Sequence, residues 1–171
     1  MILVTVGTHS QGFDRLVRGM DQLAAELEEP VIIQWGSSTY IPQYAEHFQF
    51  TTSQRMAELS QEARIIVSHA GSGTIIAALQ ARKPLVLAPR LKQFDEHMDD
   101  HQQQLAKALA ARGRVVVALE LTVDTLRQAL NQAVRQDIQL TETHQLVNAL
   151  HRQLDEWHLT KIQPKPATKE A

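Results

Sequence analysis

The stretch IIVSHAGSGT at residues 65–74 decides the fold of this chain. Its first four residues form a short apolar run rich in β-branched side chains, which is typical of a buried strand. A turn with two glycines follows directly, and an apolar segment at residues 74–81 has the length of a short helix. A strand that passes through a tight turn into a helix is the repeating unit of a parallel sheet with crossover helices.

The same alternation continues along the chain in both directions. We expect helices around residues 16–27 and at residues 53–62, 74–81, 96–112 and 123–135, and strands at residues 2–6, 31–35, 48–50, 65–68, 85–88 and 115–118. Most of these strands are apolar on both faces, as in a sheet that helices cover on both sides. The sequence therefore predicts an α/β fold, a single Rossmann-like domain with a parallel sheet of about six strands and helices on both faces.

The C-terminal part has a different pattern. A last helix is expected at about residues 141–157, where a stripe of Leu146, Leu150, Leu154 and Trp157 either closes the core or covers another subunit. Residues 161–171 are rich in Pro, Lys and Thr, which predicts a flexible tail. We therefore expect one domain over residues 1–160, followed by the tail.

Composition excludes several classes of protein. The chain has 171 residues, no cysteine, and 17 basic against 19 acidic side chains, which gives a net charge of −2. This balance removes the general electrostatic attraction on which most nucleic-acid-binding proteins depend, so we expect no nucleic-acid partner. The sequence contains no run of 18 apolar residues, and its N-terminal apolar run is too short for a secretion signal. We expect a cytoplasmic protein.

Ligands of open parallel α/β sheets bind beyond the carboxyl ends of the strands. Three segments in such places are unusual, namely residues 7–12 (GTHSQG), 68–74 (SHAGSGT) and 89–102 (PRLKQFDEHMDDHQ). Glycines and hydroxyl residues at a strand-to-helix turn leave backbone N–H groups free for an anion, and the helix dipole adds positive potential. Residues 71–74 therefore predict a phosphate site. A plain tight turn, with glycine chosen for its backbone angles, is the alternative.

Several named motifs do not match. The P-loop pattern fails because no Lys follows the glycines, the dinucleotide pattern fails at Ile76, and the hydrolase elbow fails at Ala70. His97 and His101 are four residues apart, as on one face of a helix, and with Asp100 they resemble a zinc motif. The usual Glu is missing, however, and no third ligand is evident. The sequence favours no metal, so we expect backbone amides and a helix end to neutralise a bound diphosphate.

Several segments, read in order, resemble one family. They are residues 4–8 (VTVGT) with 13–16 (FDRL), then residues 68–74, then residues 83–86 (KPLV), and then residues 96–97, 100–102 and 105–106. Over residues 1–120 the chain resembles the C-terminal, nucleotide-sugar-binding half of GT-B glycosyltransferases. More narrowly, it resembles the small subunit of split enzymes, which are the dolichol-linked N-acetylglucosaminyltransferase of eukaryotes and the bacterial exopolysaccharide or capsule glycosyltransferases.

The resemblance implies a UDP-sugar as the donor substrate, and no cofactor or metal. It implies that Gly7 and Thr8 lie beside the diphosphate, and it assigns a residue set to the nucleotide and phosphates and another to the donor sugar. The first set is His69, Ala70, Gly71, Ser72, Gly73 and Thr74, and the second is Asp100, His101 and Gln102.

Two positions stay open within this resemblance. His9 is the candidate for catalytic proton transfer, with a structural or phosphate-contacting role as the alternative. Ala77 stands where related enzymes carry a Glu that binds the ribose hydroxyls. Ribose recognition is therefore unassigned, and this departure favours the exopolysaccharide branch.

A GT-B enzyme needs two Rossmann-like halves, and this chain is expected to supply one. The resemblance therefore implies a hexosyltransferase that is active only with a membrane-anchored partner subunit, which carries the site for a polyprenyl-diphosphate-linked acceptor. The chain would then be peripheral to the inner face of the membrane through that partner. One alternative is a non-catalytic nucleotide-sugar-binding regulatory module of a polysaccharide-synthesis complex. A UDP-sugar epimerase relative is a weaker alternative, because such enzymes need both halves in one chain.

Overall fold

A computed structural model describes residues 1–98, 101–113 and 115–135 of this chain. The expected last helix with its stripe from Leu146 to Trp157, the expected tail at residues 161–171, and Asp100 lie outside the described residues. The fold and the site below are therefore those of the first 135 residues.

The described residues contain one six-stranded sheet. Its strands are β1 (Ile2–Thr5), β2 (Val31–Gln34), β3 (Glu46–Phe48), β4 (Ile65–Ser68), β5 (Leu85–Leu87) and β6 (Val116–Val117). Their order in the sheet is β3-β2-β1-β4-β5-β6, and every neighbouring pair is parallel. This architecture confirms the predicted Rossmann-like α/β fold. The edge strand β3 begins and ends two residues earlier than the expected strand at residues 48–50, and it is not apolar on both faces, because Glu46 and His47 are exposed.

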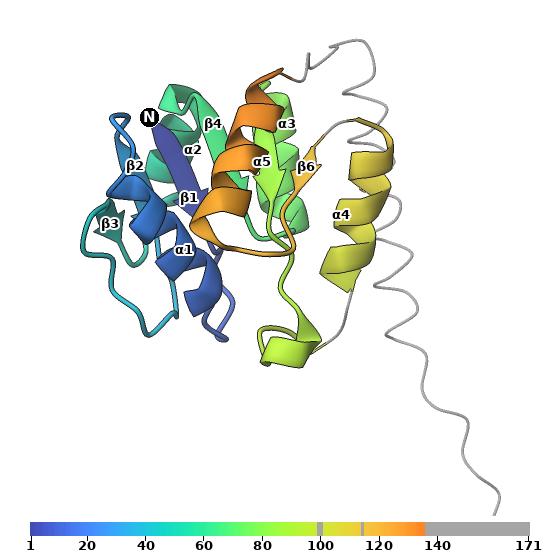
Figure 1. Ribbon diagram of the computed structural model, residues 1–171, viewed down its shortest axis with the longest axis horizontal. Helices are drawn as coiled ribbons and strands as arrows, with labels where there is room; N and C mark the ends of the chain where they lie inside the picture. Colours follow the sequence, from blue (N-terminus) through green and yellow to red (C-terminus); the bar gives the residue numbers. More distant parts are fainter. Residues whose placement is uncertain (99–100, 114, 136–171) are drawn as a thin grey trace, which may run out of the picture. The chain divides into compact units, whose positions relative to one another are not determined.

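Helices cover both faces of this sheet. They are α1 (Asp14–Ala24), α2 (Ser53–Glu62), α3 (Ser72–Gln80), α4 (His101–Ala111) and α5 (Val123–Arg135). Figure 1 shows α1 and α5 on one face of the sheet and α2 and α3 on the other. The bounds of α2 and α5 match the expected ones, whereas α3 begins earlier, at Ser72. Among the described residues, no helix has the length and apolar character required to cross a membrane.

The segment before α4 corrects one expectation. A helix was expected from residue 96, but Lys92–Phe94 forms a short 3₁₀ turn and Asp95 adopts a left-handed conformation with φ of 54°. The Glu96 carboxylate closes this turn by accepting the N–H of Leu91 at 3.0 Å. His97 therefore does not lie on α4. The expectation that His97 and His101 share one face of a helix, which suggested a zinc motif, is wrong.

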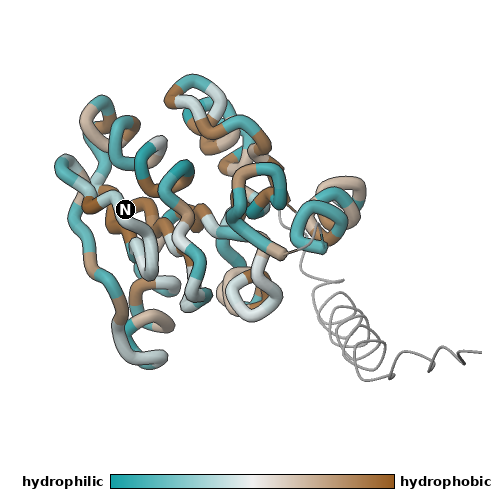
Figure 2. The backbone as a smooth tube through the Cα atoms, turned by 90° about the horizontal axis from the view of Figure 1, so that it is seen from below, coloured by the Kyte–Doolittle hydropathy of each residue, from teal (hydrophilic) through white to brown (hydrophobic). Residues whose placement is uncertain are grey.

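Apolar side chains of the strands alternate between two packed layers. On one face, Leu16, Met20 and Leu23 of α1 are fully buried in the same core as the strand residues Val4 and Ile33. This arrangement explains the spacing of apolar residues in the sequence, because positions three and four apart share a helix face. Figure 2 shows the resulting alternation of hydrophilic and hydrophobic colours along the helices.

Gly19 marks the close approach of α1 to α5 and the turn before it. A Cβ atom at Gly19 would overlap the carbonyl oxygen of Leu121 and lie 2.9 Å from Cδ1 of Leu126. We expect Gly19→Ala to lower the free energy of unfolding by about 2 kcal/mol, because overpacking against backbone outweighs the gain in helix propensity. Urea denaturation measures this. Gly73→Ala, in α3 with nothing within 4 Å of the added Cβ, is the control that should cost nothing.

The strand order places a switch point at the carboxyl ends of the two central strands, β1 and β4. β1 lies between β2 and β4, so the chain leaves β1 toward one side and leaves β4 toward the other. Ligands of open α/β sheets bind at such a switch point, beyond the carboxyl ends of the strands. Residues 6–13 follow β1 there, and residues 69–71 follow β4.

Candidate functional site

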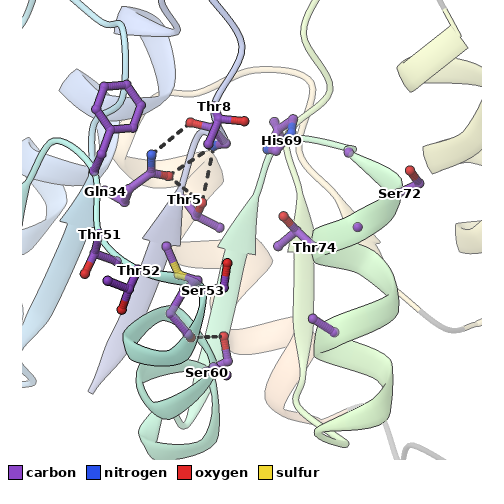
Figure 3. Close-up of a pocket in the computed structure, with 17 residues that line it drawn as sticks. Thr5, Thr8, Gln34, Thr51, Thr52, Ser53, Ser60, His69, Ser72 and Thr74 are labelled. Atoms are coloured by element: carbon purple, nitrogen blue, oxygen red, sulfur yellow. Dashed lines mark hydrogen bonds between the residues drawn. The ribbon is translucent and has the colours of Figure 1, made fainter.

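A cavity of about 510 Å³ lies at the carboxyl ends of β1 to β4 (Figure 3). Four groups of residues line it: Thr5, Gly7 and Thr8 from β1 and its loop, Gln34 at the end of β2, residues 50–53 after β3, and His69 with residues 71–74 after β4. Helices α2 and α3 add Met56, Ala57, Ser60 and Ala77. The cavity is therefore built at the switch point of the sheet, and it has the size of a small-molecule site.

The N-terminus of α3 forms one wall of this cavity. Gly71 is its N-cap residue, and no side chain accepts a hydrogen bond from the first turn. The first N–H groups of a helix have no partners within the helix, and they carry the positive end of its dipole. Ser72, Gly73 and Thr74 line the cavity, and a Cβ at Gly73 would meet nothing within 4 Å. This end of the helix has the geometry of an anion site.

The imidazole of His69 is wedged between two glycines. A Cβ atom on Gly7 would lie 2.5 Å from Cε1 of the ring, and one on Gly71 would overlap Nε2. Gly7 also has a positive φ of 75°, which other residues rarely adopt. Gly7 and Gly71 therefore make room for the His69 ring, whereas Gly73 faces open space. The sequence does not distinguish these two roles.

His69 is neutral at pH 7. Burial, and after it the positive charge of Arg90, lower the pKa of His69 from 6.5 to about 4. A bound anion therefore meets a neutral ring here, which can form hydrogen bonds but supplies no positive charge. The attraction for an anion must come from α3 and from other groups.

This pKa has a consequence for stability. Because the folded pKa is about 4 and the ordinary value is 6.5, the unfolded chain binds more protons between these values, and stability falls as the pH falls through this window. We expect His69 to account for a loss of about 2 kcal/mol between pH 7 and pH 5. Urea denaturation at both pH values measures this loss, and His69→Gln should remove most of the difference. An equal loss in both proteins would contradict the assignment.

Gln34 fixes the peptide of Gly7. Oε1 of Gln34 accepts the N–H of Gly7 at 3.1 Å and the hydroxyl of Thr5 at 2.6 Å, and its Nε2 donates to the carbonyl of Gly7 at 2.8 Å. The N–H of Gly7 is therefore not free for an anion. Sequence reasoning missed Gln34, although a polar residue that ends the apolar strand β2 is a signal.

His9 lies outside the cavity lining, in an exposed part of the loop after β1. Its Nδ1 accepts the N–H of Gln11 at 3.1 Å, and its ring centroid is 5.5 Å from that of His97. Burial, Arg90 and His97 lower its pKa. A neutral ring that accepts at Nδ1 carries its proton at Nε2, so the remaining nitrogen is a donor. This geometry favours a contacting role for His9 over that of a proton acceptor.

The structure brings only some of the expected residues together. Gly7, Thr8, His69 and residues 71–74 line the cavity. Ala70 is buried beside it, and His101 and Gln102 are not part of its lining. Oε1 of Gln102 accepts the N–H of Arg90 at 3.1 Å. Within the described ranges, no group of three His, Cys, Asp or Glu side chains could hold a metal ion.

Sequence reasoning missed the wall after β3. Phe50, Thr51, Thr52 and Ser53 line the cavity there, and the hydroxyl of Thr52 caps α2 by accepting the N–H of Arg55 at 3.2 Å. The run of three hydroxyl residues was the available signal. Ala77 also lines the cavity, so the position where a ribose-binding Glu was expected does face the site.

Comparison with known proteins gives consistent matches. The model of the glycosyltransferase family 28 C-terminal domain matches residues 1–164. The UDP-N-acetylglucosamine transferase subunit ALG13 of Eremothecium gossypii is 33% identical over 86 residues, which are 50% of this chain and 40% of that protein. The UDP-N-acetylglucosamine--N-acetylmuramyl-(pentapeptide) pyrophosphoryl-undecaprenol N-acetylglucosamine transferase of Phenylobacterium zucineum is 40% identical over 74 residues, 42% of this chain and 19% of that protein.

A solved structure agrees in fold. The NMR solution structure of ALG13 has a TM-score of 0.59 and 19% sequence identity, and the alignment covers 90% of this chain and 94% of that one. The two curated relatives are matched over less than half of their own length.

Proposed function

The chain belongs to the family of glycosyltransferase family 28 C-terminal domains, and from this premise we propose that it is the donor-binding subunit of a heteromeric glycosyltransferase that uses a UDP-sugar. The observation that carries the proposal is the uncapped N-terminus of α3, which opens into a cavity at the switch point of the sheet. The diphosphate of a nucleoside diphosphate is an anion that such a helix end binds, and its ribose and base can extend from there into the cavity.

The diphosphate lies at residues 72–74 in this proposal, and the nucleoside extends toward α2. On that side the cavity is lined by the hydroxyl residues Thr74 and Ser60 (Figure 3) and by the apolar residues Met56 and Phe50. Phe50 is 50% exposed and offers an apolar face to a base. The N–H groups of α3 would stabilise the charge that develops on the departing UDP, which is the electrostatic task of a transfer without metal.

The names of two relatives support a proposal for the acceptor and the partner. The Phenylobacterium zucineum protein is named for an acceptor linked to undecaprenol through a pyrophosphoryl group, and the Eremothecium gossypii protein is named as a subunit. We propose a polyprenyl-diphosphate-linked acceptor, bound by a membrane-anchored partner subunit at the cytoplasmic face. We place the reaction in exopolysaccharide or capsule synthesis, because Ala77 replaces the expected ribose-binding Glu.

A protein-detected NMR titration with UDP tests the donor site, with GDP and NAD as controls. We expect UDP alone to shift the amide signals of Thr8 and residues 71–74. Absence of shifts, with and without the partner, would refute the donor site. A sugar-transfer assay with the partner then tests the activity, and binding of UDP without transfer would identify the regulatory module instead.

A further inference from the structure

Arg90 is the largest fully buried side chain among the described residues, and it is 1% exposed. It follows β5, and its guanidinium donates to four backbone carbonyls. Nη1 donates to Gln11 at 3.0 Å, Gly12 at 2.7 Å and Glu96 at 3.2 Å, and Nη2 donates to Val6 at 3.0 Å. A buried charge is costly, so this arrangement needs a reason.

The four carbonyls belong to two loops that meet at the candidate site. Val6, Gln11 and Gly12 stand at the two ends of the loop that carries Thr8 and His9, and Glu96 belongs to the segment before α4. Arg90 therefore joins the two ends of the loop at residues 6–12 and connects this loop to the segment before α4.

Two more contacts reach the segment before α4, one from the first loop and one from α1. Nε2 of Gln11 donates to the carbonyl of Asp95 at 2.9 Å. The guanidinium of Arg15 donates to both carboxylate oxygens of Glu96, at 3.0 and 2.9 Å. The Glu96 carboxylate is thus bound to Arg15 rather than to Arg90.

The charge of Arg90 is not offset by a direct ion pair. Within residues 1–98, 101–113 and 115–135, no carboxylate oxygen lies within 4.0 Å of its nitrogens, and its Nε has no hydrogen-bond partner. The guanidinium lies over the ring of Phe13, 4.9 Å from the centroid. Burial lowers the pKa of Arg90 to about 10, so it stays charged at pH 7. After burial, its charge is the next cause of the lowered pKa values of His9 and His69, so its field reaches the site.

We propose that Arg90 is a positioning residue for the donor diphosphate. It holds the loop at residues 6–12 against the segment at residues 91–97, and its positive charge acts on His69 in the cavity wall, although Arg90 itself is not part of the cavity lining. An anion in the cavity is then attracted both by the N-terminus of α3 and by this buried charge. The ligand in this inference is the UDP group of the proposed function.

The test compares Arg90→Met, which removes the charge, with Arg90→Lys, which keeps it. Arg64→Met is the control for the loss of a positive charge, because Arg64 pairs with Glu29 and precedes β4, at the amino end of the strand and away from the cavity. Two quantities are measured in each protein, namely amide hydrogen exchange at residues 7–12 without ligand and the dissociation constants of UDP and uridine.

We expect Arg90→Met to raise the rate of amide hydrogen exchange in this loop at least tenfold. It should also raise the dissociation constant of UDP at least tenfold, while that of uridine changes less than twofold. Arg90→Lys should loosen the loop but preserve much of the preference for UDP over uridine, and Arg64→Met should change neither quantity. If Arg90→Met does not fold, Arg90→Lys still tests both roles. Its hydrogen exchange at residues 7–12 tests the positioning role, and its preference for UDP over uridine tests the role of the charge.

Three results would overturn the inference. If Arg90→Met weakened the binding of UDP and of uridine equally, Arg90 would have a structural role only. An unchanged affinity for UDP would exclude an effect of its charge. Unchanged exchange in the loop would exclude positioning. Failure of the unmutated protein to bind UDP would instead refute the proposed function and the ligand part of this inference, while loop exchange alone would still decide whether Arg90 positions the loops.

Discussion

Gly73→Asp is expected to weaken UDP binding by a factor of a hundred or more while leaving the protein at least as stable as before. The new carboxylate would stand in the first turn of α3, at the position where we place the diphosphate, and it would repel that anion at close range. The same carboxylate interacts favourably with the helix dipole, which adds about 0.3–1 kcal/mol to stability. Because nothing lies within 4 Å of a Cβ at Gly73, no clash offsets this gain.

Calorimetric titration with UDP and thermal unfolding measure the two opposite effects. Gln80→Glu is the matched control, because it adds the same charge to the last turn of α3, away from the cavity lining. Gly73→Ala separates size from charge and should weaken UDP less than Gly73→Asp does. If Gly73→Asp binds UDP as tightly as the unmutated protein does, the turn at residues 71–74 is a plain turn and the phosphate site is wrong.

Asp21→Ala is expected to lower the free energy of unfolding by about 3–5 kcal/mol, because it leaves one buried and three partly buried donors without their acceptor. Asp21 lies in α1 and is fully buried. Its carboxylate accepts the hydroxyl of Tyr40 at 2.6 Å and the N–H groups of Gln43, Tyr44 and Ala45 at 2.9, 2.9 and 3.0 Å. One side chain thus anchors the whole segment that leads into β3.

The charge of Asp21 is retained at neutral pH. Burial by itself would raise its pKa, but the hydroxyl and the three amides outweigh burial and lower it. Its contribution to stability is therefore complete at pH 7, and it is lost as the pH falls through the lowered pKa. Urea denaturation at pH 7 measures the effect. Asp21→Asn keeps one acceptor oxygen and should cost less than Asp21→Ala. Gln22→Ala at the exposed neighbouring position should change stability by less than about 0.5 kcal/mol. A loss below 1 kcal/mol for Asp21→Ala would contradict the anchoring role.

Local patterns in the sequence determined most of the fold. Helices α2 and α5 and strand β4 have the predicted bounds, because apolar periodicity and turn residues act over a few positions. The largest departure is the segment at residues 92–97, where a carboxylate contact with Leu91 and a left-handed Asp95 replaced the expected start of α4. Local helix propensity could not reveal that competing turn.

The sequence by itself also predicted a phosphate site and determined which family the chain belongs to. The turn at residues 71–74 consists of consecutive residues, so it can be recognised in the sequence, and the family match covers the same region. Only the tertiary structure decided which residues build the rest of the site. Gln34 reaches Gly7 across 27 positions, and Arg90 reaches Val6 across 84. Such partners have no spacing rule in the sequence, because the order of the strands in the sheet, not the order of residues in the chain, brings them together.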